Sequence, residues 1–117
     1  MANNTGVSLT FTSTSDAHVT VPVGRLKGPG AGAFLRVDLL GRGPSNLIIN
    51  EITAGFTVPT TGTPKVQAVQ QITNLGDTNP PQVQFNIDPV TYTINMVVTG
   101  VKNQTIYWSA SGNLMQC

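Results

Sequence analysis

The chain has 117 residues, a formal net charge of +1 and 9% charged side chains. This length fits one domain with a core large enough to need no disulfide or metal. The charge balance is not basic enough for a nucleic-acid-binding protein, and no apolar stretch approaches the roughly 20 residues of a membrane span. We therefore expect neither nucleic acid nor membrane as a partner.

The composition predicts β-structure. Thr and Val dominate, Ile is common, and Glu51 is the one glutamate. β-branched side chains suit a pleated, half-buried surface, whereas long helices draw on Ala, Glu, Lys and Leu. With so few charges, Thr, Ser, Asn and Gln must cover the exposed faces. Two interpretations stay open: these groups are simply solvated, or much of the surface lies against partners.

The first half of the chain predicts four strands separated by Gly, Pro and Asn turns. Apolar residues recur at every second position over 7–14, 17–23 and 33–40, and a longer apolar run covers 47–58. Pro22 has no amide hydrogen to donate, so the second strand is expected at a sheet edge or to end there.

The third and fourth strands are expected to differ in how they are covered. In the third, Leu35, Val37 and Leu39 share one face and Arg36 and Asp38 the other. The fourth is nearly continuous in apolar residues, which predicts a central strand covered on both faces. A bulge or kink is expected in it at Gly55.

The stretch 64–75 is ambiguous. Its apolar residues recur every three positions, Thr63-Pro64 is able to cap a helix, and Gly76 is able to end one. The alternation of Val66 with Ala68 among Gln and Thr residues permits an irregular strand instead. A strand is favoured over a helix.

Three further strands are expected after a turn at 76–81. They cover 82–88, 90–99 and 104–114, with Asp77 and Asp88 as turn formers. In the second of the three, one face collects Val90, Tyr92, Ile94, Met96 and Val98. In the last, the inward face collects Ile106, Trp108, Ala110, Gly112 and Leu114. Short strands at this spacing predict a single all-β domain, an antiparallel β-sandwich or jelly roll of about eight strands.

No constellation of residues predicts catalysis, and we expect a protein that is not an enzyme. The single histidine, His18, alternates with apolar neighbours and is expected to point outward. A Ser–His–Asp triad would need it, yet no Gly-x-Ser-x-Gly motif is present. The single cysteine, Cys117, forms no internal disulfide and is a poor nucleophile at a terminus.

Neither a cofactor nor a metal is expected. Asp16 is the only metal-ligand type close to His18 in sequence. The loop Gly24–Gly32 is rich in glycine but lacks the Gly-Lys-Ser/Thr of a phosphate-binding loop. The polar N-terminus has no signal-peptide pattern, which predicts synthesis in a cytoplasm.

The C-terminal third resembles short virion β-proteins of tailed phages and prophages. In that pattern a strand ends in Thr-Gly-Val, a short turn follows, and a Thr-Ile-x-Trp strand closes the domain; here the run is 99–110. The preceding Asn-Pro-Pro-Gln-Val-Gln-Phe-Asn-Ile extends the resemblance to about residues 79–112. The resemblance implies a virion component, either a head decoration (cement) protein or a tail-associated domain.

A decoration protein would bind the major capsid protein or other virion proteins, often as a homo-oligomer such as a dimer or trimer. The expected contacts are Arg25, Lys27, Gly28 and Gly30 of an adaptable loop, and outward-facing Tyr107. Residues 1–6 are expected to form a flexible arm. The alternative is a carbohydrate- or receptor-binding domain of a phage tail, for which Tyr107 has no obvious aromatic companion.

Overall fold

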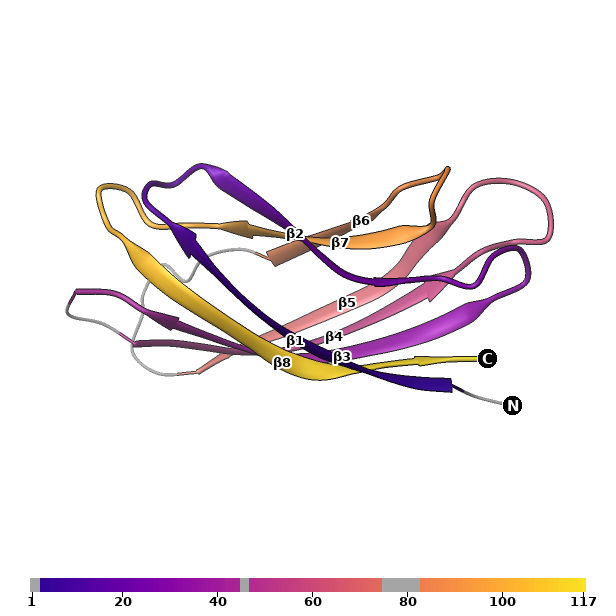
Figure 1. The fold of residues 1–117 in the computed structure, drawn as a ribbon, viewed down its shortest axis with the longest axis horizontal. Helices are drawn as coiled ribbons and strands as arrows, with labels where there is room; N and C mark the ends of the chain where they lie inside the picture. The colour runs from indigo at the N-terminus through magenta and orange to yellow at the C-terminus, as the bar shows by residue number, and fades with distance from the viewer. Residues whose placement is uncertain (1–2, 45–46, 75–82) are drawn as a thin grey trace.

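Two antiparallel β-sheets pack face to face (Figure 1). The buried apolar side chains form one core cluster. The computed structural model describes residues 3–44, 47–74 and 83–117. No helix in this described part is long and apolar enough to cross a membrane. The strands are β1 (Asn3–Ser13), β2 (His18–Arg25), β3 (Gly32–Arg42), β4 (Leu47–Thr57), β5 (Lys65–Asn74), β6 (Val83–Ile87), β7 (Thr93–Thr99) and β8 (Ile106–Gln116).

The strands are divided unequally between the sheets. The large sheet has the order β1-β8-β3-β4-β5 and the small sheet the order β2-β7-β6. β1 pairs with β8 and β2 pairs with β7, so strands from the two ends of the chain lie side by side in both sheets. The expected all-β fold of two antiparallel sheets and about eight strands is confirmed.

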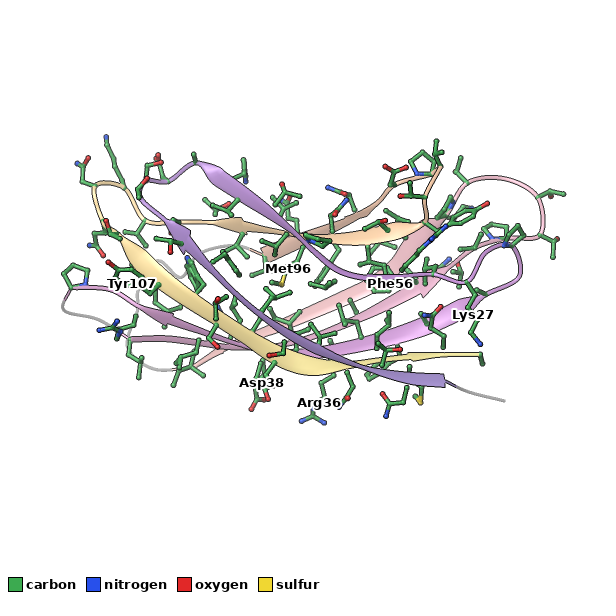
Figure 2. The ribbon with its side chains drawn as sticks, viewed as in Figure 1. Lys27, Arg36, Asp38, Phe56, Met96 and Tyr107 are labelled. Atoms are coloured by element: carbon green, nitrogen blue, oxygen red, sulfur yellow. The ribbon has the colours of Figure 1, made fainter. Side chains whose placement is uncertain are left out.

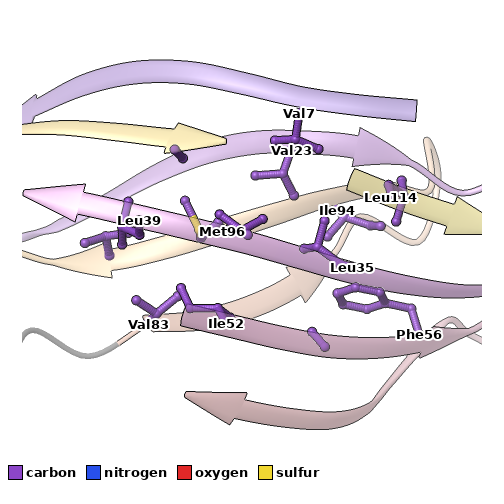
Figure 3. Packing of buried hydrophobic residues seen from close by; sticks show 14 of the residues in the cluster. Val7, Val23, Leu35, Leu39, Ile52, Phe56, Val83, Ile94, Met96 and Leu114 are labelled. Atoms are coloured by element: carbon purple, nitrogen blue, oxygen red, sulfur yellow. The ribbon is translucent and has the colours of Figure 1, made fainter. Parts of the chain in front are cut away.

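Alternation along each strand builds the core. On β3, Leu35, Val37 and Leu39 are buried while Arg36 and Asp38 are exposed, as expected. Figure 3 shows Leu35 and Leu39 in the same core as Ile94 and Met96 of the small sheet, and Val37 belongs to this cluster too. The inward residues of β8 follow the expected phase as well; Ile106, Trp108, Ala110 and Leu114 are all buried.

The edge position of β2 and the strand at 64–75 are confirmed. β2 is an edge strand of the small sheet, and it continues past Pro22 through a register shift between Pro22 and Gly24. The ambiguous stretch forms β5, an edge strand of the large sheet. The irregularity expected at Gly55 lies between Gly55 and Phe56, opposite an extra residue on β5.

The prediction that β4 is covered on both faces is wrong. β4 lies between β3 and β5, but only its inward face is buried, as at Ile48 and Ile52. Leu47 on the other face is 47% exposed. The small sheet covers one side of the large sheet, so an apolar residue on the opposite side has no neighbour to bury it.

The expected start of the seventh strand is also wrong. Val90 is 82% exposed and Tyr92 has a left-handed φ of 60°, so both belong to a turn that precedes β7. The Asp88 carboxylate accepts hydrogen bonds from the amides of Val90 at 2.8 Å and Thr91 at 3.2 Å. These local bonds override the alternation, and they confirm Asp88 as a turn former.

Two expectations concern the ends of segments. Residues 3–6 of the expected N-terminal arm continue β1 and pair with β8, with Gly6 opposite Asn113. Backbone hydrogen bonding to β8 therefore replaces the expected flexibility over these residues. The turn at 76–81, including Asp77, lies outside the described residues.

Trp108 anchors β8 in the core. Its indole N–H donates to the Ser13 hydroxyl at 2.9 Å, and both residues are 2% exposed. Its ring stacks near Phe11 of β1, with centroids 6.0 Å apart. On the other side, β3 presents Gly41, where an added Cβ would lie 2.6 Å from the indole.

We expect Ser13→Ala to destabilise the fold by about 1–3 kcal/mol, because it leaves the buried indole N–H without an acceptor. Urea unfolding measures this loss. Ser8→Ala, on the exposed face of the same strand, is the matched control and changes stability by less than about 0.5 kcal/mol. Equal losses in the two variants would contradict the role of the Ser13–Trp108 bond.

The Asp88 turn predicts a pH dependence of stability. The two backbone amides hold the pKa of the Asp88 carboxyl below its ordinary value. A depressed pKa in the folded state stabilises the fold above the unfolded-state pKa, and that contribution disappears as the pH falls through the folded-state pKa. We expect Asp88→Asn, measured by urea unfolding from about pH 6 to about pH 3, to lose less stability on acidification than the wild type. An unchanged pH profile would contradict this assignment.

Candidate functional site

The large sheet has a face that nothing in the described chain covers, and we call it the outer face. It consists of the side chains that point away from the small sheet, as Figure 2 shows for Arg36 and Asp38. Its members are Asn4, Gly6, Ser8, Thr10 and Thr12 of β1, Tyr107, Ser109, Ser111, Asn113 and Met115 of β8, Phe34, Arg36, Asp38, Leu40 and Arg42 of β3, and Leu47, Ile49, Glu51, Thr53 and Gly55 of β4.

Large apolar side chains stand at both ends of this outer face. Phe34 and Met115 are direct cross-strand partners at one end, and Leu40 and Leu47 lie toward the other. These four side chains are between 44% and 47% exposed. Single exposed apolar residues are ordinary, whereas pairs of them in register on one sheet face make that face a candidate site.

A band of charge separates the two apolar ends. Asp38 lies directly opposite Glu51, and Arg36 lies one outward position along β3. Like charges facing each other across two strands are destabilising. Within the described part of the chain, no ion pair joins Arg36 to either carboxylate. The band therefore carries both signs of charge without neutralising them internally.

The end of the outer face near Tyr107 is hollowed. A groove of about 470 Å³ is lined by Thr10, Phe11, Thr12, Leu40, Arg42, Leu47, Tyr107, Trp108 and Ser109. Tyr107 is 55% exposed, and the Arg42 guanidinium carbon lies 5.3 Å from its ring centroid. The groove thus combines an aromatic ring, a cation and the hydroxyls of β1 and β8.

The loop that joins β2 to β3 carries the other expected contact residues. Gly28 and Gly30 adopt positive φ angles of 137° and 84°, which glycine tolerates. The amide of Gly30 donates to the Val58 carbonyl at 2.8 Å, and the amide of Lys27 donates to the Gln116 side chain at 3.0 Å. These bonds connect the loop to two neighbouring segments, and the adaptability of the loop stays a prediction.

The expected contact residues do not form one site. Lys27 lies at one end of the molecule and Tyr107 near the other (Figure 2). The Arg25 side chain contacts the turn before β7, where its Nε–H donates to the Thr91 carbonyl at 2.8 Å. Arg25, Lys27 and Gly30 are exposed at the end of β2 and in the loop that follows it, whereas Gly28 is buried, and Tyr107 belongs to the outer face.

Groups with catalytic potential are scattered through the described residues. No group of three or more His, Cys, Asp or Glu side chains there is placed to hold a metal ion. His18 is exposed, and its Nδ1 lies 3.1 Å from the Thr99 hydroxyl. Cys117 is exposed at the end of the chain.

Sequence reasoning missed the apolar part of the outer face. The signal was present on β3, where Phe34 and Leu40 share the alternation phase of Arg36 and Asp38. Large apolar residues in a phase that contains charges are expected to be exposed. Alternation along β3 does not predict which residues of other strands lie beside it, because that depends on the pairing of β3 with β8 and β4.

Comparison with protein families, curated proteins and solved structures finds no match to this chain. The function must therefore be inferred from the geometry of the chain itself.

Proposed function

We propose that this chain is a non-enzymatic structural protein of a virion, a decoration protein that binds the major capsid protein and stabilises the phage head as a homo-oligomer. The observation that carries the proposal is the outer face, whose exposed Phe34, Leu40, Leu47 and Met115 lie on one face of the large sheet. Such a surface fits a protein partner better than a small substrate. The resemblance of residues 79–112 to virion β-proteins supplies the setting.

The end of the molecule around the β2–β3 loop is the second surface of this proposal. Lys27 is exposed there, and Lys65 starts β5 beside the same group of loops. The hydrogen bond of the Lys27 amide fixes the backbone at this position, and the two ammonium groups suit acidic groups of a capsid subunit. Many weak contacts repeated over a shell add up through multivalency.

Co-sedimentation with empty phage heads tests the proposal. We expect the wild-type chain to pellet with shells, and Lys27→Glu to weaken binding several-fold with a smaller salt dependence, because the variant removes a cation at the contact. Lys102→Glu makes the same charge change in the turn before β8 and is the matched control. A wild-type chain that stays in the supernatant with shells of every available phage type contradicts the proposal.

The Tyr107 groove supports a second candidate, a carbohydrate-binding domain of a phage tail. An exposed aromatic ring flanked by Thr10, Thr12 and Ser109 hydroxyls suits a sugar, which offers both apolar C–H faces and hydroxyl groups.

A glycan array with the purified chain distinguishes the two candidates. If the second holds, Tyr107→Ala abolishes binding to a glycan that the wild type retains, while Tyr107→Phe keeps most of it, because the ring carries the stacking. Absence of binding to any glycan would remove this candidate and leave the decoration protein.

A further inference from the structure

We infer that a second copy of this chain covers the outer face, related to the first by a two-fold axis that crosses the strands between Arg36 and Asp38. The inference rests on the proposed function for the homo-oligomer and deepens it by naming the surface and the orientation. Three features of the outer face support this partner: its charge pattern, the placement of its apolar residues and its area.

The charge band is complementary to itself in one orientation. Outward residues that pair across the strands form a row, such as Arg36 with Thr53 or Asp38 with Glu51. A two-fold axis between Arg36 and Asp38, perpendicular to β3 and parallel to the sheet, exchanges these two rows. Arg36 of each copy then faces Asp38 of the other and lies next to Glu51. The unfavourable Asp38–Glu51 juxtaposition within one copy is offset by a cation from the second. An axis parallel to the strands between β3 and β4 would instead set Asp38 against Glu51 and is disfavoured.

The same operation pairs part of the apolar ends, while Met115 falls on Ser109 and Leu47 on Thr57. The row of Phe34 falls on the row of Leu40, so each aromatic ring meets an aliphatic side chain of the other copy. Ile49, in the Leu40 row, falls on Gly55, in the Phe34 row. A Cβ built on Gly55 would meet nothing within 4 Å, so the open space above this position leaves room for an isoleucine of the second copy. The two-fold axis repeats this Ile49–Gly55 contact, as an isologous interface requires.

The area is that of a stable dimer. β1, β3, β4 and β8 each have 11 residues. At about 3.3 Å per residue and about 4.8 Å between strands, these four strands offer a face of roughly 700 Å². A standard stable interface buries about 800 Å² on each partner. When two sheets pack face to face, their strands lie within about 30° of each other. At such an angle, the residues beside the two-fold axis stay closest to their partners in the other copy.

Sedimentation equilibrium with two charge reversals tests this interface. The wild type is expected to be a dimer, and Arg36→Glu and Asp38→Arg are each expected to weaken dimerisation at least tenfold, because like charges then meet twice across the axis. Mixed in equal amounts, the two variants are expected to form a heterodimer. The glutamate introduced at 36 then faces the arginine introduced at 38, and the native Arg36 faces the native Asp38. Lys102→Glu is the matched control and leaves the dimer unchanged.

Gly55→Val tests the Ile49–Gly55 contact without disturbing the monomer. The added side chain meets no atom of its own chain at Cβ, and valine suits a strand, so urea unfolding of the monomer is expected to be unchanged or improved. Dimerisation is expected to weaken at least tenfold because Ile49 of the partner loses its space. A dimer that survives this variant and both charge reversals lies on another surface, such as the β1 edge, and overturns the inference.

The shell-binding experiment separates this inference from the proposed function. A dimer that behaves as described but never binds shells upholds the interface and rejects the decoration role. A wild-type chain that is monomeric at its highest soluble concentration rejects the interface. If that monomer binds shells and Arg36→Glu abolishes the binding, the outer face contacts the capsid instead and the decoration role stands.

Discussion

The register of β8 between β1 and β3 is the constraint on which both the core and the outer face depend. A shift of one residue would turn every side chain of β8 to the opposite face. Trp108 resists this shift from both sides, since its N–H needs the Ser13 hydroxyl and its ring needs the space at Gly41. Farther along β8, a Cβ at Gly112 would lie 1.9 Å from the Arg36 carbonyl oxygen, so only glycine permits the approach of β3 there.

The same register decides which residues become neighbours on the outer face. Because Trp108 points inward opposite Gly41, Tyr107 lies beside Arg42 and Met115 lies beside Phe34. Neither pair is close in sequence, and each exists only because a buried residue next to it fixes the strand. The groove at one end and the apolar cluster at the other are thus consequences of core packing, held by a rigid sheet rather than by a loop.

Local patterns predicted what depends on local geometry. Alternation along β3 and β8 identified Leu35, Val37 and Trp108 as core, because the period of a strand is a property of the backbone. The same rule failed at Val90, where hydrogen bonds to Asp88 make a turn. It also failed on β4, because apolar composition does not reveal whether a second layer of structure is present to cover a face. Pairing between distant strands had no local signal, so the apolar part of the outer face could not be assembled from the sequence.

The scarcity of charge has different consequences on the two halves of the outer face. Along β1 and β8 the outward residues are mostly Ser, Thr and Asn, whose hydroxyls and amides remain satisfied by water. Along β3 and β4 they are Phe34, Leu40, Leu47 and Ile49 around a narrow charged band. A partner that covered only the polar half would gain little from desolvation, whereas one that covered β3 and β4 gains from apolar burial and must also satisfy Arg36, Asp38 and Glu51. Both requirements meet on the same two strands, so any partner of this face must bring apolar groups together with charges of both signs. The outer face of a second copy meets that condition through the two-fold relation alone.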